Sequence, residues 1–109
     1  MMRKLGVVAL ILGALTFTVS GVSWADKSHA AEAVDHTKEA IEHGKAGHAD
    51  VLVKHAEVAL KHAKQAGKGP HVDEGVMHLE GAIADGKKGN AAGGTKHAEE
   101  ALKHLSEVK

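Results

Sequence analysis

Apolar residues recur along this chain at helical spacing in four separate stretches. In each stretch they repeat every three or four residues and so share one face of an amphipathic helix, while polar residues occupy the other faces. The four apolar faces consist of Ala30, Ala33, Val34, Ala40 and Ile41; Leu52, Ala56, Ala59, Leu60 and Ala63; Val72, Val76, Leu79 and Ile83; and Ala98, Leu102, Leu105 and Val108. The pattern predicts four helices, over residues 28–44, 49–66, 71–86 and 95–108.

Glycine-containing segments separate the four predicted helices. Gly44 and Gly47 interrupt the pattern after the first helix, residues 67–70 interrupt it after the second, and Gly86 and Gly89 interrupt it after the third. Connections this short favour antiparallel packing of consecutive helices. We therefore expect an all-α protein with an up-down-up-down four-helix bundle.

The second half of the bundle repeats the first. When the chain is shifted by 42 positions, residues 29–62 align with residues 71–104, and 18 of the 34 aligned positions are identical. The repeat predicts a bundle made of two similar helical hairpins. Gly93 and Gly94 stand where the first half has Val51 and Leu52. Because glycine is a poor helix former, we expect the fourth helix to begin late, near residue 95, or to fray in its first turn.

The first 25 residues have the features of a targeting segment. Arg3 and Lys4 precede an apolar run over residues 5–19, and Ser23 and Ala25 are the small residues that a signal peptidase site requires. The sequence predicts a cleaved secretory signal peptide over residues 1–25 and a mature domain over residues 26–109. An uncleaved amino-terminal membrane anchor is the alternative interpretation.

Cleavage after residue 25 changes the composition that matters for function. It removes Phe17 and Trp24, the two aromatic residues, and the mature chain also lacks cysteine, which excludes disulfides and thiolate ligands. The mature chain has twelve lysines and fourteen acidic residues, so its net charge is −2 with neutral histidines and +8 when all ten are protonated. Without a basic patch or aromatic side chains for base stacking, we expect no nucleic-acid partner, and after cleavage no membrane contact.

Histidines recur at intervals of seven residues on all four predicted helices. Each row lies beside the apolar face, at the edge of the core, and successive histidines are about 10.5 Å apart along the helix. In antiparallel hairpins the level pairs are His29 with His62, His36 with His55, His43 with His48, His71 with His104, and His78 with His97. The pattern leaves open whether the rows face each other within each hairpin or between the two hairpins.

Imidazole rows of this kind are suited to metal ions. Helices about 8–10 Å apart let level imidazoles converge on one ion, so all ten histidines are candidate ligands. A glutamate between two successive histidines of a row, three residues after one and four before the next, could add an oxygen donor, and these are Glu32, Glu39, Glu74 and Glu100. A level histidine pair with one such glutamate would form a three-ligand site. Acids at this spacing also form ordinary ion pairs on helix surfaces.

The turns of the two predicted hairpins differ in their histidines. His43 and His48 flank the first turn, whereas Asp85 and Asn90 occupy the equivalent positions of the second. We therefore expect metal at this end of the bundle to favour His43 and His48, with Asp85 as a supporting ligand at most.

The donor types favour Cu(II), Ni(II) and Zn(II), with Cu(II) expected to bind most tightly. Met77 is the only methionine of the mature chain, so a thioether site for Cu(I) has no support. Neither H-E-x-x-H nor the E-x-x-H pair of di-iron bundles occurs, and a chain without aromatic residues has little with which to form a haem or substrate pocket. We expect a binding protein and no enzymatic activity.

Three segments carry a resemblance to a known family: HGKAGH over residues 43–48, HVDEGVMHLE over residues 71–80 and KHAEEALKHL over residues 96–105. With the heptad histidines, they resemble the small metal-binding protein family of nitrifying bacteria, over nearly the whole mature chain. The resemblance implies a periplasmic four-helix bundle that binds several divalent ions, copper prominently, with ligand roles for the ten histidines. This chain lacks the histidine-rich carboxy terminus of that family.

Two functional hypotheses follow. The first is a monomeric periplasmic protein that binds, buffers or scavenges divalent transition-metal ions and contributes to metal homeostasis. The alternative is a pH-responsive structural or chaperone-like protein that uses histidine protonation and the resulting change in charge. A chelator distinguishes them, because only the first predicts a thermal stability that increases with metal and falls again with EDTA.

Overall fold

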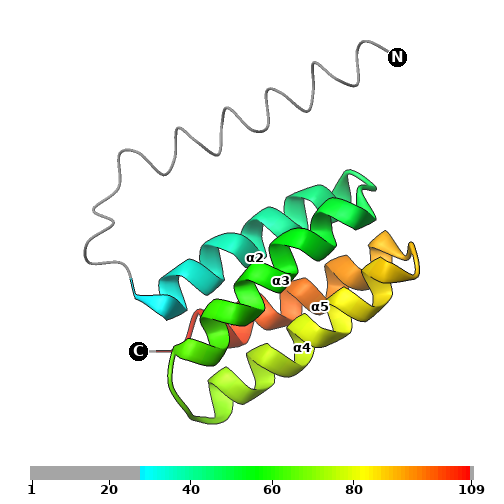
Figure 1. Ribbon diagram of the computed structural model, residues 1–109. Helices are drawn as coiled ribbons and strands as arrows, with labels where there is room; N and C mark the ends of the chain where they lie inside the picture. The colour runs from blue at the N-terminus through cyan, green and yellow to red at the C-terminus, as the bar shows by residue number, and fades with distance from the viewer. Residues whose placement is uncertain (1–27, 109) are drawn as a thin grey trace, which may run out of the picture.

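The computed structural model describes residues 28–108, and this part of the chain forms four α-helices without strands (Figure 1). The helices are α2 (His29–Lys45), α3 (Ala49–Gln65), α4 (Pro70–Lys87) and α5 (Ala91–Leu105). The predicted signal peptide over residues 1–25, and its alternative as an anchor, lie outside the described residues. None of the four described helices has the length and apolar character needed to cross a membrane.

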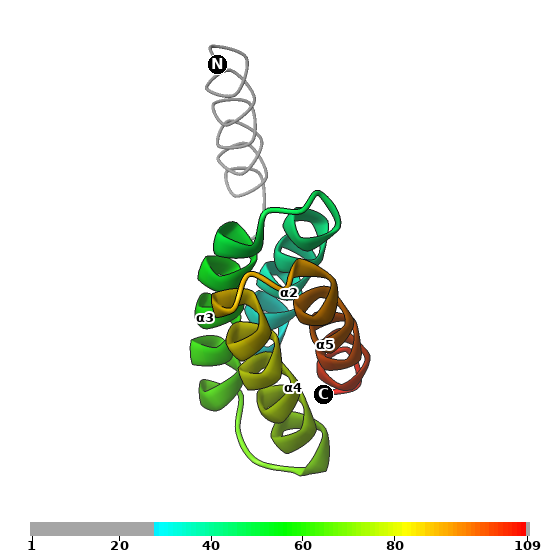
Figure 2. The same cartoon turned by 90° about the vertical axis from the view of Figure 1, so that its right-hand side faces the viewer.

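Consecutive helices run antiparallel and form two hairpins, α2–α3 and α4–α5 (Figure 1). The hairpins lie side by side, with α3 packed on α4 and α2 packed on α5, and together they enclose one core (Figure 2). The predicted all-α four-helix bundle is confirmed. The up-down order of the helices follows from their short connections, because a link of a few residues brings each helix back beside the previous one.

Alanine dominates the core. The fully buried alanines are Ala33, Ala40, Ala56, Ala59, Ala63, Ala82, Ala98 and Ala101. Side chains this small let the helices approach closely, and only a few larger residues, such as Leu52 and Leu79, fill the remaining space. The histidine rows lie beside this core, and His43 is the one histidine of the described residues that is buried.

Two leucines of the core pack directly against glycines. Leu52 of α3 lies against Gly94 of α5, where an added Cβ atom would come within 3.2 Å of both Leu52 methyl groups. Leu105 lies over Gly75 of α4, where an added Cβ would be 2.6 Å from Leu105 Cδ2. The glycine at position 94, which weakens the helix intrinsically, therefore makes room for a side chain of the other hairpin.

The prediction for the fourth helix was wrong at both ends. α5 begins at Ala91, because the Asn90 side chain caps it by accepting a hydrogen bond from the Gly93 backbone N–H at 3.0 Å. Packing on Leu52 and this cap together offset the low helix propensity of glycine. α5 ends at Leu105 instead of residue 108, where the next residues form a tighter turn with Val108 N–H donating to the Leu105 carbonyl at 3.2 Å.

Candidate metal-binding groups

Level histidines lie ring to ring in both hairpins. The centroids are 5.3–6.3 Å apart in the pairs His29–His62, His36–His55, His43–His48, His71–His104 and His78–His97. Each pair joins the two helices of one hairpin, and no histidine ring contact within residues 28–108 joins the hairpins to each other. Of the two arrangements that the sequence left open, the structure therefore has the one within each hairpin.

Three further contacts run diagonally between neighbouring levels, with ring planes only 2–7° from parallel: His36–His62, His43–His55 and His78–His104. A glutamate one turn earlier on the helix joins each diagonal pair. The three resulting groups are Glu32–His36–His62, Glu39–His43–His55 and Glu74–His78–His104. In each group one donor atom per residue lies within 4.8 Å of the other two. Ligands about 2.0–2.2 Å from a tetrahedral ion are about 3.3–3.6 Å apart, so the side chains would have to close by about 1 Å to bind one together.

The diagonal geometry departs from the expected combination of a level pair with one glutamate. Side chains on a helix lean toward its amino terminus. In an antiparallel hairpin, His36 on α2 and His62 on α3 therefore lean toward each other, although their backbone positions differ in level by one histidine interval. The same lean brings His43 to His55, and His78 to His104. Backbone levels alone do not include this tilt, so the sequence indicated the level ring contacts but not these diagonal ones.

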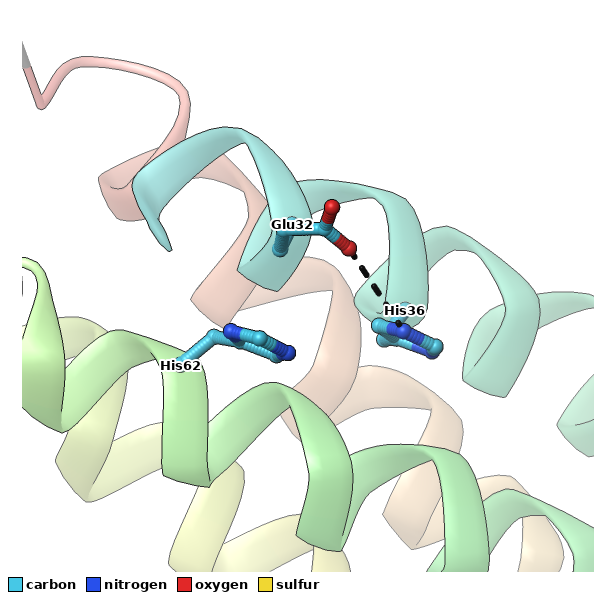
Figure 3. A group of neighbouring side chains, drawn as sticks. All are labelled: Glu32, His36 and His62. Carbon is cyan, nitrogen blue, oxygen red and sulfur yellow. Dashed lines mark ion pairs between the residues drawn. The ribbon is translucent and has the colours of Figure 1, made fainter. Parts of the chain in front are cut away.

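Glu32 and His36 show how one helix contributes two donors (Figure 3). Glu32 Oε1 lies 3.9 Å from His36 Nε2 one turn along α2, and His62 approaches from α3 across the hairpin (Figure 3). The side chains of Glu32 and His36 are each about one-third exposed. The group is thus positioned by two rigid helices and remains open to solvent on one side.

The group Glu39–His43–His55 is the most enclosed, with only 6% of His43 exposed. Burial lowers the pKa of His43, and His48 adds to the effect. Burial together with the nearby His43 and His36 lowers the pKa of His55 to about 4. Both imidazoles are therefore neutral at pH 7, which is the form that binds a metal ion.

Glu39 completes this electrostatic arrangement. Burial raises the pKa of its carboxyl, and Glu42 and Asp35 add to the increase. These surroundings disfavour an additional negative charge, so a cation at the group would relieve both the desolvation and the repulsion. The electrostatic surroundings of Glu39 therefore disfavour its ionised carboxylate when no cation is present, and a divalent ion bound there would stabilise that form.

Five candidate ligands lie outside the three groups: His29, His48, His71, His97 and Glu100. His29 extends the row, with its Nδ1 3.1 Å from His62 Nδ1, whereas Glu100 pairs with Lys103 at 3.5 Å. His71 Nε2 lies 3.4 Å from Glu107 Oε1, a partner that the sequence analysis missed. Glu107 follows His104 by one helical turn, and His104 is level with His71 in the hairpin. This spacing would have indicated Glu107 as a partner of His71.

The second hairpin lacks one group that the repeat would otherwise provide. Gly81, Asp85 and His97 occupy the positions equivalent to Glu39, His43 and His55. His97 Nε2 lies 3.6 Å from Asp85 Oδ2, and an added Cβ on Gly81 would come 2.9 Å from His97 Nδ1. The His97 ring therefore lies close to the backbone at the place where the first hairpin has a glutamate side chain.

A family model described as small metal-binding protein matches residues 2–108, almost the full length of the chain. The chain belongs to this family. No curated protein matches it. The family resemblance predicted from the histidine pattern is therefore confirmed. Membership of the small metal-binding protein family supports metal binding, and the three histidine–glutamate groups could hold a metal ion.

Each group offers this small metal-binding protein two imidazole nitrogens and one carboxylate oxygen. Such a set fits divalent transition-metal ions that accept mixed N/O ligands. Three protein donors leave further coordination positions for water or another ligand. The arrangement is consistent with binding in partly open sites, repeated along the bundle.

Proposed function

We propose that the protein is an exported, periplasmic buffer or scavenger of divalent transition-metal ions, and that it acts by binding and not by catalysis. The observation that carries this proposal is the repetition of one ligand set, two histidines and one glutamate, at three places on a single small bundle. Repetition of the same donors provides capacity. A catalytic site would instead concentrate different chemical roles in one place.

The partial exposure of the groups favours reversible binding. Of the six histidines in the three groups, all except His43 are only partly buried. Each group supplies three donors. Water or another chelating molecule can therefore reach a bound ion and displace the protein ligands one at a time. We expect moderate affinity at each site and rapid exchange, as a buffer requires.

Cu(II), Ni(II) and Zn(II) are the proposed cargo. The donors set no rigid geometry, since they come from flexible side chains at the edge of the core, and in such a site affinity follows the Irving–Williams order. Cu(II) should therefore bind most tightly. Because protons compete for the imidazoles, binding should weaken as the pH falls below about 6.5.

Calorimetric titration of Cu(II) and Ni(II) into protein lacking residues 1–25, at pH 7.5, tests the proposal. We expect three ions per chain, one for each group. Binding of less than one equivalent would show that the groups are ordinary helix-surface pairs. A competing chelator of known affinity, titrated in parallel, gives the affinity per site and separates specific binding from weak adsorption.

The proposed location has its own test. Expression of the full chain in a bacterial host followed by osmotic shock should release a protein that begins at Asp26, as amino-terminal sequencing would detect. Recovery of the uncleaved chain in the membrane fraction would instead support the anchor. The protein is proposed to act as a monomer, and light scattering with and without Cu(II) checks this.

A further inference from the structure

The α2–α3 hairpin contains an unbroken row of six stacked or tilted imidazoles. We call it the imidazole ladder, and it runs in the order His29, His62, His36, His55, His43 and His48. Successive ring centroids are 5.3, 5.9, 5.9, 5.2 and 6.3 Å apart. The ladder alternates between the two helices, since level and diagonal contacts follow one another along its whole length.

Two of the metal-binding groups lie next to each other on this ladder. His36 belongs to the group with Glu32 and His62, and His55 belongs to the group with Glu39 and His43. The rings of His36 and His55 are stacked at 5.9 Å with 26° between their planes. The last imidazole of one ligand set therefore touches the first imidazole of the other.

This contact provides a route for an ion. An ion held in the Glu32 group could take His55 as a ligand as it releases His62. It would then exchange Glu32 for His43 and His36 for Glu39, which completes the second ligand set. Each stage exchanges one nitrogen or oxygen donor for another and leaves the charge of the ion unchanged. A ligand fixed a few ångströms away acts at a high effective concentration, which favours its attack over that of a ligand arriving from solution.

The other hairpin offers no such route. Its imidazole contacts join His71, His104, His78 and His97, and the row then ends at the carboxylate of Asp85. It carries one group, Glu74–His78–His104, and within residues 28–108 no histidine ring contact connects it to the ladder. An ion moving between the hairpins must therefore pass through solution.

We propose that a divalent ion bound to the α2–α3 hairpin moves directly between the Glu32 and Glu39 groups by ligand exchange at the His36–His55 contact. This inference rests on the proposed function, because it assumes that both groups bind metal. Direct movement would let the more open group collect an ion and pass it to the more enclosed one. The hairpin then acts as a two-position store, while the Glu74 group acts as a separate site.

Exchange spectroscopy by NMR on the purified protein tests the inference. The probe is Zn(II), which is diamagnetic, added at one equivalent to protein labelled at its histidine rings, and single His62→Ala, His55→Ala and His104→Ala variants assign the signals of the three groups. We expect zinc to exchange between the two α2–α3 groups at least roughly tenfold faster than with the Glu74 group. The faster rate should not change with protein concentration or with an added weak zinc buffer.

The Glu74 group is an internal control in the same molecule, and His55→Ala supplies a second one. In that variant the Glu32 and Glu74 groups remain, and exchange between them should occur only at the slow rate. Equal rates among all three groups of the unmodified protein, or a fast rate that follows the zinc buffer, would overturn the proposal. Failure to bind zinc at all would instead contradict the proposed function itself, so the two failures are distinguishable.

Discussion

The two hairpins of the bundle share one architecture but differ in the number of candidate metal-binding groups. α2–α3 carries two groups and α4–α5 carries one. The positions responsible are Glu39 and His43 in the first hairpin, which Gly81 and Asp85 replace in the second; the turn also differs, with Asn90 in place of His48. All three differences lie near the turn end of the bundle, whereas the Glu32 group and its counterpart at Glu74 are both intact.

The comparison shows that fold and metal capacity are specified by different residues. Ala40 and Ile41 of the first hairpin recur as Ala82 and Ile83 of the second, and the core keeps its packing. Apart from the buried His43, the histidines are at least partly exposed at the edge of that core, so changing one of them costs little packing energy. Metal capacity can therefore be lost from one hairpin, or restored to it, without a new fold.

The largest effect is expected from removing one ligand from each group of a hairpin. His55→Ala combined with His62→Ala disrupts both groups of α2–α3, and the number of bound Cu(II) ions should fall from three to one. His104→Ala disrupts the single group of α4–α5 and should leave two. Calorimetry at pH 7.5 measures both values, with circular dichroism as the control for folding. Equal losses in the two variants would refute the unequal capacity of the hairpins.

A smaller change should follow from rebuilding the missing group. Gly81→Glu with Asp85→His gives the second hairpin the ligands of the first and should raise the number of bound ions from three to four. The His97 ring must first move away from position 81, where the new Cβ would come 2.9 Å from its Nδ1. A ring on a side chain with two rotatable bonds can make this movement.

The matched control for the rebuilt group is Gly81→Gln with Asp85→His. The glutamine side chain has nearly the same size as glutamate but has no carboxylate, so the fourth ion should bind more weakly in this control than in the glutamate variant. A glutamate variant that folds and still binds three ions would show that the ligand set alone does not create a group, and would weaken the assignment of the Glu39 group as well.

The enclosure of His55 predicts a pH dependence of stability for the metal-free protein. The pKa of this imidazole is about 4 in the folded state, against about 6.5 for an unfolded chain. Between these values the unfolded chain binds a proton at His55 that the folded protein does not, so stability falls as the pH falls from about 6.5 to about 4. Urea unfolding of metal-free protein across this range measures the effect.

Substitution separates this contribution from those of other groups. His55→Gln removes the titrating imidazole and should flatten the profile between about pH 6.5 and 4. His97→Gln, at the equivalent position of the second hairpin, is the control for the loss of one imidazole and should leave the His55 contribution in place. Profiles of the unmodified protein and His55→Gln that stay parallel would contradict the proposed cause.

Much of this structure could be predicted from the sequence because both of its periodicities belong to the helix backbone. Apolar spacing identified the four helices, and the seven-residue histidine spacing identified the level pairs, such as His36 with His55, that the structure brings into contact. These relations depend only on rise and rotation per residue. They are therefore accessible without any knowledge of side-chain conformation.

The composition of each group was not accessible in the same way. It depends on the lean of His36 and His62 toward each other, which is a property of side chains and of the helix direction. The start of α5 likewise depends on contacts between Leu52 and Gly94 that join the two hairpins. Local propensity indicated a weak helix there, and tertiary packing together with the Asn90 cap reversed that expectation.

The smallest effect concerns the residue that precedes the second helix of each hairpin. Asn90 caps α5 through Gly93, whereas His48, its counterpart, makes no capping bond to α3. Asn90→Ala should therefore destabilise the metal-free protein by about 0.5–2 kcal/mol in urea unfolding, and His48→Ala by much less. Asn90→Ser keeps a capping oxygen and should restore most of the loss. The same position thus extends the imidazole ladder in one hairpin and stabilises a glycine-rich helix start in the other, and equal costs for the two alanine variants would refute this division of roles.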